Sequence, residues 1–378
     1  MSKGEMLAAR KKCTRFLSHR HPSHRQPQHA LAELAQFTGP ELDPDNYGKG
    51  EVIEGFEAEV ALLLGKKSAA FMPSGTMAQQ IALRIWANRR GTRLVAFHPT
   101  SHLELHEERA YETLHGLRAV LVGSQHRLLT LDDLKQVAEP LGAILLELPQ
   151  REIGGQLPEW DDLCAIVTWG RENCIPLHMD GARLWECQPF YGRSYAEIAG
   201  LFDSVYVSFY KGLGGIAGSI LAGPCDFIAE SRIWQKRHGG ALISLYPYVL
   251  SARKGLVDCL ARMGDYHEKA IEVAAVLASF PEIDVVPCPP HTNMMHVYIR
   301  GDLHRLERAA FEIANELGTY LFDELRPTPL PTEHKFELTV NEATLELSNE
   351  EIAAMFHHLL SKAGARGSAR EKTPALHG

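Results

Sequence analysis

A lysine follows a short apolar run near the middle of the chain. The segment DSVYVSFYKGLGG, residues 203–215, predicts a buried strand, then Lys211, then a glycine-rich loop. A lysine at the end of a buried strand is costly unless it finds a partner or does chemistry, and desolvation favours the neutral amine that forms imines with carbonyls. A side chain that merely reaches solvent from the strand end would give the same pattern, so this segment alone supports both interpretations.

An aspartate ends a second apolar run earlier in the chain. In IPLHMDGARLW, residues 175–185, Asp180 ends the run, and Gly181 and Arg183 follow it. A carboxylate at a strand end can accept a hydrogen bond from a pyridinium nitrogen and keep that nitrogen protonated, which makes the ring an electron sink. Ligands of open α/β sheets bind at the carboxyl ends of strands, where Asp180 and Lys211 would both lie.

A third segment, MPSGTMAQQ, passes from a strand into a helix at Ser74, Gly75 and Thr76. The free N–H groups and the positive end of a helix form a phosphate site, to which the two hydroxyls add donors. An ordinary helix N-cap uses the same residue types. The three segments together nevertheless provide a phosphate site, a ring-nitrogen partner and an imine-forming lysine, and so predict bound pyridoxal 5'-phosphate (PLP).

The spacing of apolar residues indicates which elements carry these segments. Residues 52–65 and 76–91 have helical spacing and end at a glycine, whereas residues 68–75 read as a short strand and a turn. Helical stretches alternate with further short apolar runs at residues 93–98, 118–123, 142–149, 175–180, 204–209 and 219–223. This alternation predicts an α/β fold whose mostly parallel sheet has helices on both faces.

The pattern changes along the chain in a way that suggests separate domains. Residues 1–40 are polar, and from about residue 266 the elements become fewer and more amphipathic. We expect an N-terminal arm over residues 1–40, a large PLP-binding domain over 41–262, a smaller α+β domain over 263–363, and a disordered tail over 364–378.

Composition excludes several classes of protein. The 378 residues carry a formal net charge of −8 without a long basic run, which argues against a nucleic-acid partner. The seven cysteines are scattered and never spaced as C-x-x-C, which indicates reduced thiols. The first residues lack the apolar core of a secretory signal, and no apolar run is long enough to span a membrane. We therefore expect a cytoplasmic protein without a membrane partner.

At this point the sequence resembles the L-threonine aldolases, in the β-eliminating lyase group of fold-type I PLP enzymes. FMPSGTMAQQIAL resembles the phosphate segment of that family, LHMDGARLW its aspartate–arginine segment and DSVYVSFYKGLGGIAGSILAG its lysine segment. SHLELHEERA resembles the stretch whose histidine stacks on the cofactor ring, and HTNMMHVYI resembles the strand that enters the small domain. The resemblance runs in order over about residues 45 to 300.

The resemblance implies roles for individual residues. Lys211 would form the Schiff base with PLP, Asp180 would hold the ring nitrogen, and His102 would stack on the ring. The other implied cofactor ligands are Ser74, Gly75 and Thr76 at the phosphate, Arg183 near the ring or the substrate, and Arg237 at the phosphate across a subunit interface.

The chain departs from the family pattern where the family binds substrate. The N-terminal Ser-Asp-Thr segment has no clear counterpart, and Arg20 lies in that region instead. Gln150 stands roughly where the family has the histidine that faces the substrate hydroxyl, Tyr210 replaces the usual serine before the lysine, and Gln79 replaces an asparagine. The C-terminal arginine that binds the substrate carboxylate is missing. Gln150, Arg183 and Arg20 are therefore the candidate substrate-binding residues.

These observations predict a lyase that cleaves a β-hydroxy-α-amino acid to glycine and an aldehyde. The competing hypotheses are β-elimination, racemisation or transaldol transfer on the same cofactor, or a PLP-binding protein without catalysis. The family likeness also implies a homodimer or homotetramer with the active site between subunits. His98, His102 and His106 are spaced like metal ligands on a helix, but Pro99 makes one continuous helix improbable, and no metal is expected.

Overall fold

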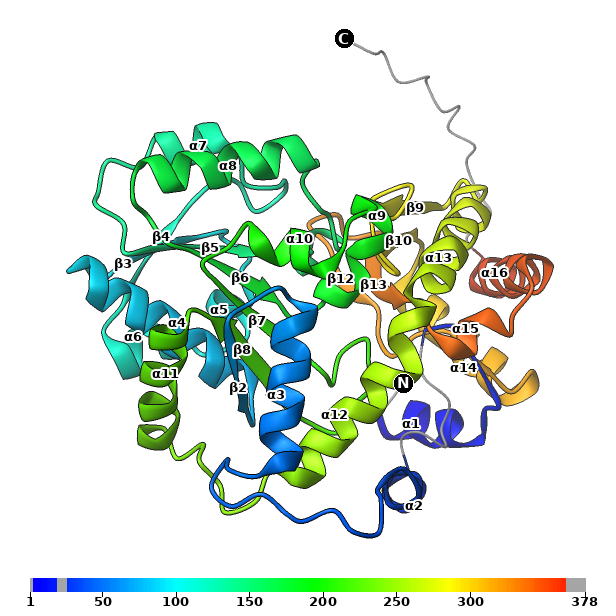
Figure 1. Ribbon diagram of the computed structural model, residues 1–378. Coiled ribbons are helices and arrows are strands. Elements are labelled where there is room, and N and C mark those ends of the chain that lie inside the picture. Colours follow the sequence, from blue (N-terminus) through cyan, green and yellow to red (C-terminus); the bar gives the residue numbers. More distant parts are fainter. Residues whose placement is uncertain (1–2, 19–25, 365–378) are drawn as a thin grey trace. The chain divides into compact units, whose positions relative to one another are not determined.

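The computed structural model describes residues 3–18 and 26–364, which fold into two compact units (Figure 1). One unit comprises residues 31–264. The other combines the N-terminal residues up to 30 with residue 265 onward. The expected tail, from residue 365 onward, lies outside the described residues.

A seven-stranded sheet forms the centre of the unit 31–264. Its strands, in spatial order, are β2 (Ser68–Met72), β8 (Ser219–Gly223), β7 (Ser204–Ser208), β6 (Leu177–Gly181), β5 (Ala143–Glu147), β3 (Leu94–Phe97) and β4 (Arg118–Leu121). The pairs from β7 to β4 are parallel, whereas β8 pairs antiparallel with both β7 and β2. Of these seven strands β8 alone runs in the opposite direction, so the prediction of a mostly parallel sheet is confirmed.

Helices lie on both sides of this sheet, with α8 on one side and α4 and α11 on the other (Figure 1). The helices along the chain are α2 (Pro27–Phe37), α3 (Glu51–Leu63), α4 (Gly75–Arg90), α5 (His102–Leu105), α6 (Ala110–His115), α7 (Leu131–Lys135), α8 (Trp160–Glu172), α9 (Gln188–Tyr191), α10 (Tyr195–Gly200), α11 (Cys225–Arg237) and α12 (Tyr246–Cys259). Short 3₁₀ turns, η2 (Arg151–Ile153), η3 (Leu184–Glu186) and η4 (Leu260–Arg262), complete the unit.

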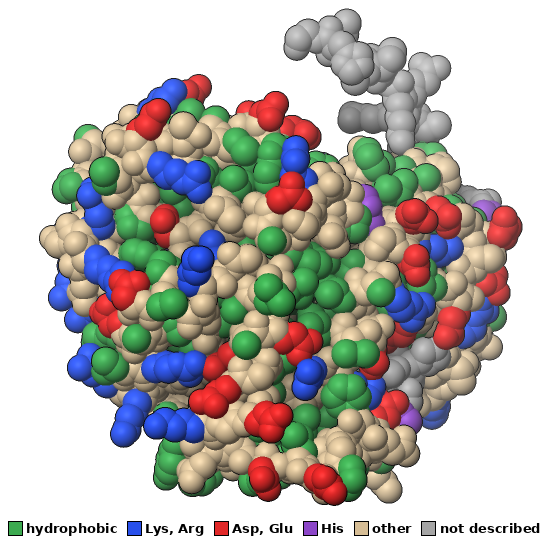
Figure 2. All heavy atoms as spheres, in the orientation of Figure 1, with side chains coloured by type: hydrophobic (Ala, Val, Ile, Leu, Met, Phe, Trp, Pro, Cys, Tyr) green, Lys and Arg blue, Asp and Glu red, His purple; other side chains and the backbone are tan. Residues whose placement is uncertain are grey.

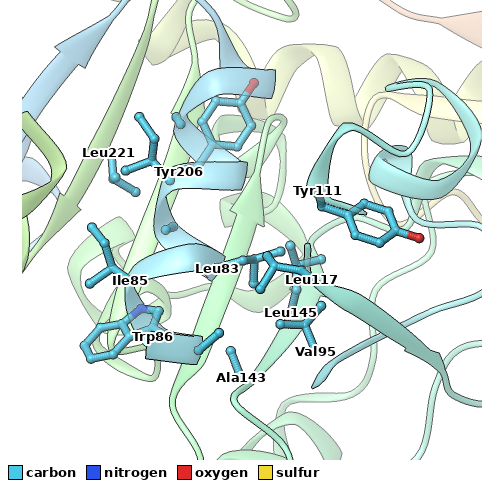
Figure 3. Packing of buried hydrophobic residues seen from close by; sticks show 14 of the residues in the cluster. Leu83, Ile85, Trp86, Val95, Tyr111, Leu117, Ala143, Leu145, Tyr206 and Leu221 are labelled. Carbon is cyan, nitrogen blue, oxygen red and sulfur yellow. The ribbon is translucent and has the colours of Figure 1, made fainter. Parts of the chain in front are cut away.

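Helix α4 anchors the core and also brings its own N-terminus to the sheet edge. It begins after Ser74, whose Oγ accepts the Met77 N–H at 3.3 Å, and ends at Gly91, which has a φ of 70° that suits glycine. Between these ends, its apolar side chains face those of the strands (Figure 3). Because each fully buried aliphatic or aromatic side chain contributes roughly 1.5–3 kcal/mol, this packing holds the helix against the sheet.

The second unit contains a four-stranded antiparallel sheet. Its strands are, in spatial order, β12 (Arg326–Pro327), β13 (Glu333–Thr339), β10 (Met294–Arg300) and β9 (Ile283–Val286). Its helices are α1 (Lys3–Lys12), α13 (Met263–Ala278), α14 (Leu303–Glu316), α15 (Glu342–Leu345) and α16 (Asn349–Ala363).

The N-terminal segment is part of this second unit. β1 (Arg15–Phe16) pairs in parallel with β11 (Thr319–Tyr320), and the buried Cys13 Sγ lies 3.4 Å from the Ala314 carbonyl oxygen. The first residues that the structure describes are thus tied to elements more than 300 residues away.

Two surface properties bear on possible partners. No helix in the described ranges is long and apolar enough to cross a membrane. On the face shown in Figure 2, Lys and Arg side chains are interspersed with Asp and Glu.

Candidate active site

The candidate site lies at the carboxyl ends of three neighbouring parallel strands. β5, β6 and β7 pair so that Glu147 is opposite Asp180 and Asp180 is opposite Tyr206. Because β8 reverses direction between β7 and β2, β2 ends at the same edge as these three strands. Side chains that follow all four strands are therefore gathered at one edge of the sheet.

Asp180 is almost completely buried yet keeps one oxygen available. Its side chain is 2% exposed, and Oδ1 accepts the Ala182 N–H at 3.1 Å. The other oxygen has no hydrogen-bond partner among the described residues. Burial raises the pKa of Asp180 to about 6, although the Ala182 N–H and the electrostatic effects of His102 and Lys211 oppose this shift. Such an enclosed acceptor suits a cationic N–H donor.

Lys211 lies in a tight loop just beyond β7. The Phe209 N–H donates to the Gly218 carbonyl at 3.2 Å, and the Gly215 N–H donates to the Phe209 carbonyl at 2.7 Å. The lysine Nζ lies 5.0 Å from the centroid of the Tyr210 ring. A Cβ at Gly212 would lie 2.4 Å from the buried Glu186 carboxylate, so a side chain after the lysine would have to displace that carboxylate.

The start of α4 provides unused donors at the same edge. The N–H groups of Gly75 and Thr76 make no hydrogen bond to any residue that the structure describes. A Cβ at Gly75 would lie 2.0 Å from Tyr206 Oη, so a glycine is required where the helix approaches β7. Adjacent free N–H groups at a helix N-terminus match an anion such as phosphate.

Two glutamates hold His102. The His102 N–H donates to Glu147 Oε2 at 3.1 Å, and the ring Nδ1 lies 3.1 Å from Glu107 Oε1. Glu107 is only 8% exposed, and its second oxygen has no hydrogen-bond partner in the described ranges. The backbone and the ring of His102 are therefore each fixed by a different carboxylate.

The sequence interpretation did not identify Glu147 as a site residue. Its Oε1 accepts the Arg151 N–H at 3.1 Å, and its Oε2 accepts the Gln150 Nε2 at 3.3 Å in addition to the His102 N–H. Burial, with the neighbouring Asp180 charge, raises the pKa of Glu147 to about 7. The signal was available, because Glu147 lies near the end of the apolar run 142–149 just as Asp180 ends the run 175–180.

Gln150 is buried beside these groups, at 3% exposure. Its amide nitrogen lies within 3.4 Å of the Thr100 carbonyl oxygen, Thr100 Oγ1 and Glu147 Oε2, all of which are acceptors. The amide is thus oriented by the loop that precedes His102. Gln150 therefore lies next to His102 and the end of β5, and so belongs to the same cluster.

A hydrogen-bonded chain lies beneath the start of α4. Trp86 Nε1 donates to Ser204 Oγ at 2.7 Å, Ser204 Oγ lies 2.8 Å from His178 Nδ1, and His178 Nε2 lies 2.7 Å from Gln79 Oε1. Because the amide oxygen only accepts, the histidine donates from Nε2, and its Nδ1 then accepts from the serine hydroxyl. Burial lowers the pKa of His178 to about 3, so the ring is neutral. Gln79 thus links the first turns of α4 to His178 on β6.

The remaining predicted residues are not all brought to this cluster. Arg183 lies three residues after Asp180, at the start of η3, and is half-buried. Arg237 ends α11 and is exposed, with its guanidinium carbon 4.5 Å from the centroid of the Trp234 ring. Arg20 lies outside the described residues.

The three spaced histidines do not share one helix. His98 follows β3, and its Nε2 contacts the carbonyl oxygens of Ser124 and Arg127, whereas His106 Nε2 lies 2.8 Å from Glu152 Oε1. Within the described ranges, no group of three or more His, Cys, Asp or Glu side chains is arranged to hold a metal ion.

A strand-end lysine, an aspartate on the adjacent strand and a helix N-terminus at the same sheet edge define the class of fold-type I α/β enzymes. The sequence profile of the β-eliminating lyases matches residues 27–301. The chain belongs to the β-eliminating lyase family, and the predicted resemblance is confirmed.

Known relatives agree with this family. A solved structure from Listeria monocytogenes, provisionally named an L-allo-threonine aldolase, is 44% identical with a TM-score of 0.91, over 95% of this chain and 99% of that one. A second, from Exiguobacterium and provisionally named an aromatic amino acid β-eliminating lyase/threonine aldolase, is 41% identical with a TM-score of 0.90, over 95% of this chain and 99% of that one. A probable low-specificity L-threonine aldolase of Arabidopsis thaliana is 27% identical, over 69% of this chain and 76% of its own length.

Proposed function

We propose that this protein is a PLP-dependent lyase that cleaves a β-hydroxy-α-amino acid to glycine and an aldehyde. The observation that carries the proposal is the arrangement of Asp180, Lys211 and the start of α4 at one sheet edge, in a chain similar to proteins named threonine aldolases. Aldehyde-lyase chemistry needs a group that accepts the electrons of the broken Cα–Cβ bond. Bound PLP supplies that electron sink.

The residues present fit this cofactor at three points. The available oxygen of Asp180 can accept a hydrogen bond from the ring nitrogen, and the free N–H groups of Gly75 and Thr76 can bind the phosphate. Lys211 can hold the cofactor covalently through its amine. By the family likeness, His102 would stack on the ring, Ser74 would add a hydroxyl at the phosphate, and Arg183 would lie near the ring or the substrate.

The hydroxyl proton of the substrate needs an acceptor other than Gln150. An amide is not a base near neutral pH, and the nitrogen of this one is committed to Thr100 and Glu147. His102 differs, because Nδ1 is held by Glu107 while Nε2 has no hydrogen-bond partner among the described residues. His102 Nε2 or a water would therefore be the acceptor of this proton.

The proposal includes a homodimer or homotetramer in which the site is completed between subunits. It rests on the family likeness and on the exposure of Arg237, whose guanidinium could then contact a phosphate of a second copy. Gel filtration with light scattering tests it directly, since a monomer of 42.1 kDa would contradict it.

Activity is tested with purified protein reconstituted with PLP. Glycine and aldehyde are measured from L-threonine, L-allo-threonine and phenylserine, in parallel with Lys211→Ala. Borohydride reduction followed by peptide mass spectrometry should place the cofactor on Lys211. Keto acid and ammonia without aldehyde would favour β-elimination instead, a racemised amino acid would favour racemisation, and an aldehyde passed to a second amino acid would favour transaldol transfer. A protein that holds PLP but turns over no amino acid would be non-catalytic.

A further inference from the structure

Glu147 links three segments around Asp180, although neither the hydroxyl proton nor the cofactor requires it. We propose that Glu147 is a positioning residue whose carboxylate fixes the His102 backbone and the Gln150 loop against the sheet edge and places a second negative charge beside Asp180. The inference rests on the proposed function, because His102 and Asp180 are groups that would face the cofactor.

The contacts of Glu147 suit a carboxylate and no other group of that size. Its two oxygens receive three donors, namely the N–H groups of His102 and Arg151 at 3.1 Å each and the Gln150 amide nitrogen at 3.3 Å. Backbone and amide N–H groups only donate here, so a protonated acid or a glutamine would direct its own hydrogen at another hydrogen. An ionised carboxylate satisfies all three donors at once.

The position of Glu147 beside Asp180 adds an electrostatic effect. The two residues are register partners on adjacent parallel strands, about 4.8 Å apart, so both side chains leave the sheet on the same side. Burial raises the pKa of both carboxyl groups, and the Asp180 charge raises that of Glu147 further. Glu107 also raises the pKa of Asp180, whereas His102 and Lys211 lower it. A cationic ring nitrogen held at Asp180 would be stabilised by both negative charges.

His102 shows why position matters as much as charge. Glu107 fixes its ring through Nδ1, while Glu147 fixes the backbone from which the ring extends. Without the contact between Glu147 and the His102 N–H, the first turn of α5 would be free to move. A helix of only four residues is not stable without such external contacts. The distance between the His102 ring and the bound cofactor would then vary.

Two substitutions separate the two effects. Glu147→Gln keeps the size of the side chain but removes the charge and one acceptor, whereas Glu147→Asp keeps the charge but is too short for the three donors. The matched control is Glu57→Gln, because Glu57 is also buried and accepts the Phe71 N–H at 2.7 Å. Its other partner is Arg232, and it makes no hydrogen bond to the described residues of β5, β6 or β7. Each variant is reconstituted with PLP and compared in cofactor dissociation constant, in the pH dependence of the visible absorbance and in kcat and KM.

We expect Glu147→Gln to weaken cofactor binding and to lower kcat by about tenfold or more each, the usual effect of losing hydrogen bonds to a charged group. Its absorbance midpoint should move to lower pH, because a negative charge that favours the protonated form of the lysine-bound cofactor is gone. Glu147→Asp should keep the midpoint but lose kcat, and Glu57→Gln should lower only thermal stability.

Two outcomes would overturn the inference. One is a folded Glu147→Gln variant with wild-type midpoint, cofactor affinity and kcat, and the other is a Glu57→Gln variant that reproduces its changes. Failure of the proposed function looks different, because wild-type protein itself would then hold no reducible cofactor at Lys211 or release no aldehyde.

Discussion

The contact between Gly75 and Tyr206 gives a sharp test of the site, through Gly75→Ala. The added methyl carbon would lie 2.0 Å from Tyr206 Oη and 2.4 Å from Cζ, where ordinary contacts are about 3.5 Å. The ring must therefore move by about 1.5 Å, yet it is 3% exposed and belongs to β7 beside Asp180. Overpacking of this kind costs about 1–3 kcal/mol. Because the Tyr206 ring lies against the start of α4, the added methyl should also displace the Gly75 and Thr76 N–H groups, and cofactor affinity should fall as well.

The matched control is Gly55→Ala in α3. Apart from the backbone of its own helix, a Cβ at Gly55 would meet no heavy atom within 4 Å, so alanine there should stabilise the helix by up to about 1 kcal/mol. The two variants are compared by urea unfolding and by PLP titration. Adding Tyr206→Phe to Gly75→Ala removes the closest contact but leaves Cζ at 2.4 Å, so recovery should be partial. Equal stability and equal PLP affinity in the Gly75 and Gly55 variants would refute the reasoning.

Three further predictions concern the groups around this contact. Ser204→Ala leaves two buried polar partners unsatisfied and should lower stability by about 1–3 kcal/mol in urea unfolding; an unchanged midpoint would show that the hydrogen-bonded chain is not needed. Burial raises the pKa of Glu147 to about 7 and of Asp180 to about 6, so the folded apoprotein binds these protons more tightly than the unfolded chain does. The stability that these two bound protons contribute is present near pH 4 and is lost as the pH rises to about 7. When unfolding of the apoprotein is followed from pH 5 to 7.5, the free energy of unfolding should therefore fall less in Glu147→Gln than in wild type. An equal fall in the two proteins would contradict this. Gly212→Ala should reduce the cofactor trapped by borohydride, because the new methyl would meet Glu186 Oε1 at 2.4 Å; wild-type trapping would count against that contact.

Much of the sheet could be predicted because buried strands appear as short apolar runs. All six runs that followed the first strand became strands, and the helix predicted over residues 76–91 begins at Gly75 and ends at Arg90. The reversed direction of β8 could not be predicted, since periodicity shows which residues are buried but not which way a strand runs. The role of the N-terminal segment in the second unit also escaped, because β1 has only two residues and its partner lies about 300 residues away.

The site was partly predictable for a related reason. Lys211, Asp180 and the Ser74–Thr76 segment each follow an apolar run, so their shared sheet edge could be deduced from topology alone. Glu147 also lies near the end of an apolar run, but its contact with His102, like that of Glu107, could not be assigned that way, because both contacts are set by how the loop at His102 folds back. Glu147 makes a contact across 45 residues, and no local pattern in the sequence indicates such a pair.

The reversal of β8 has a consequence for how Lys211 can move. The lysine sits in a hairpin connection between two paired strands, closed by the bond from Phe209 to Gly218, and not in a loop that leads to a separate helix. Lys211 lies two residues beyond Phe209, so the paired strands hold both ends of this connection at the sheet. Rotation about the side-chain bonds moves the amine without displacing either strand. The amine can reach only the points that its own side chain spans from this connection. The carbon atom that reacts with the amine must therefore lie within that distance.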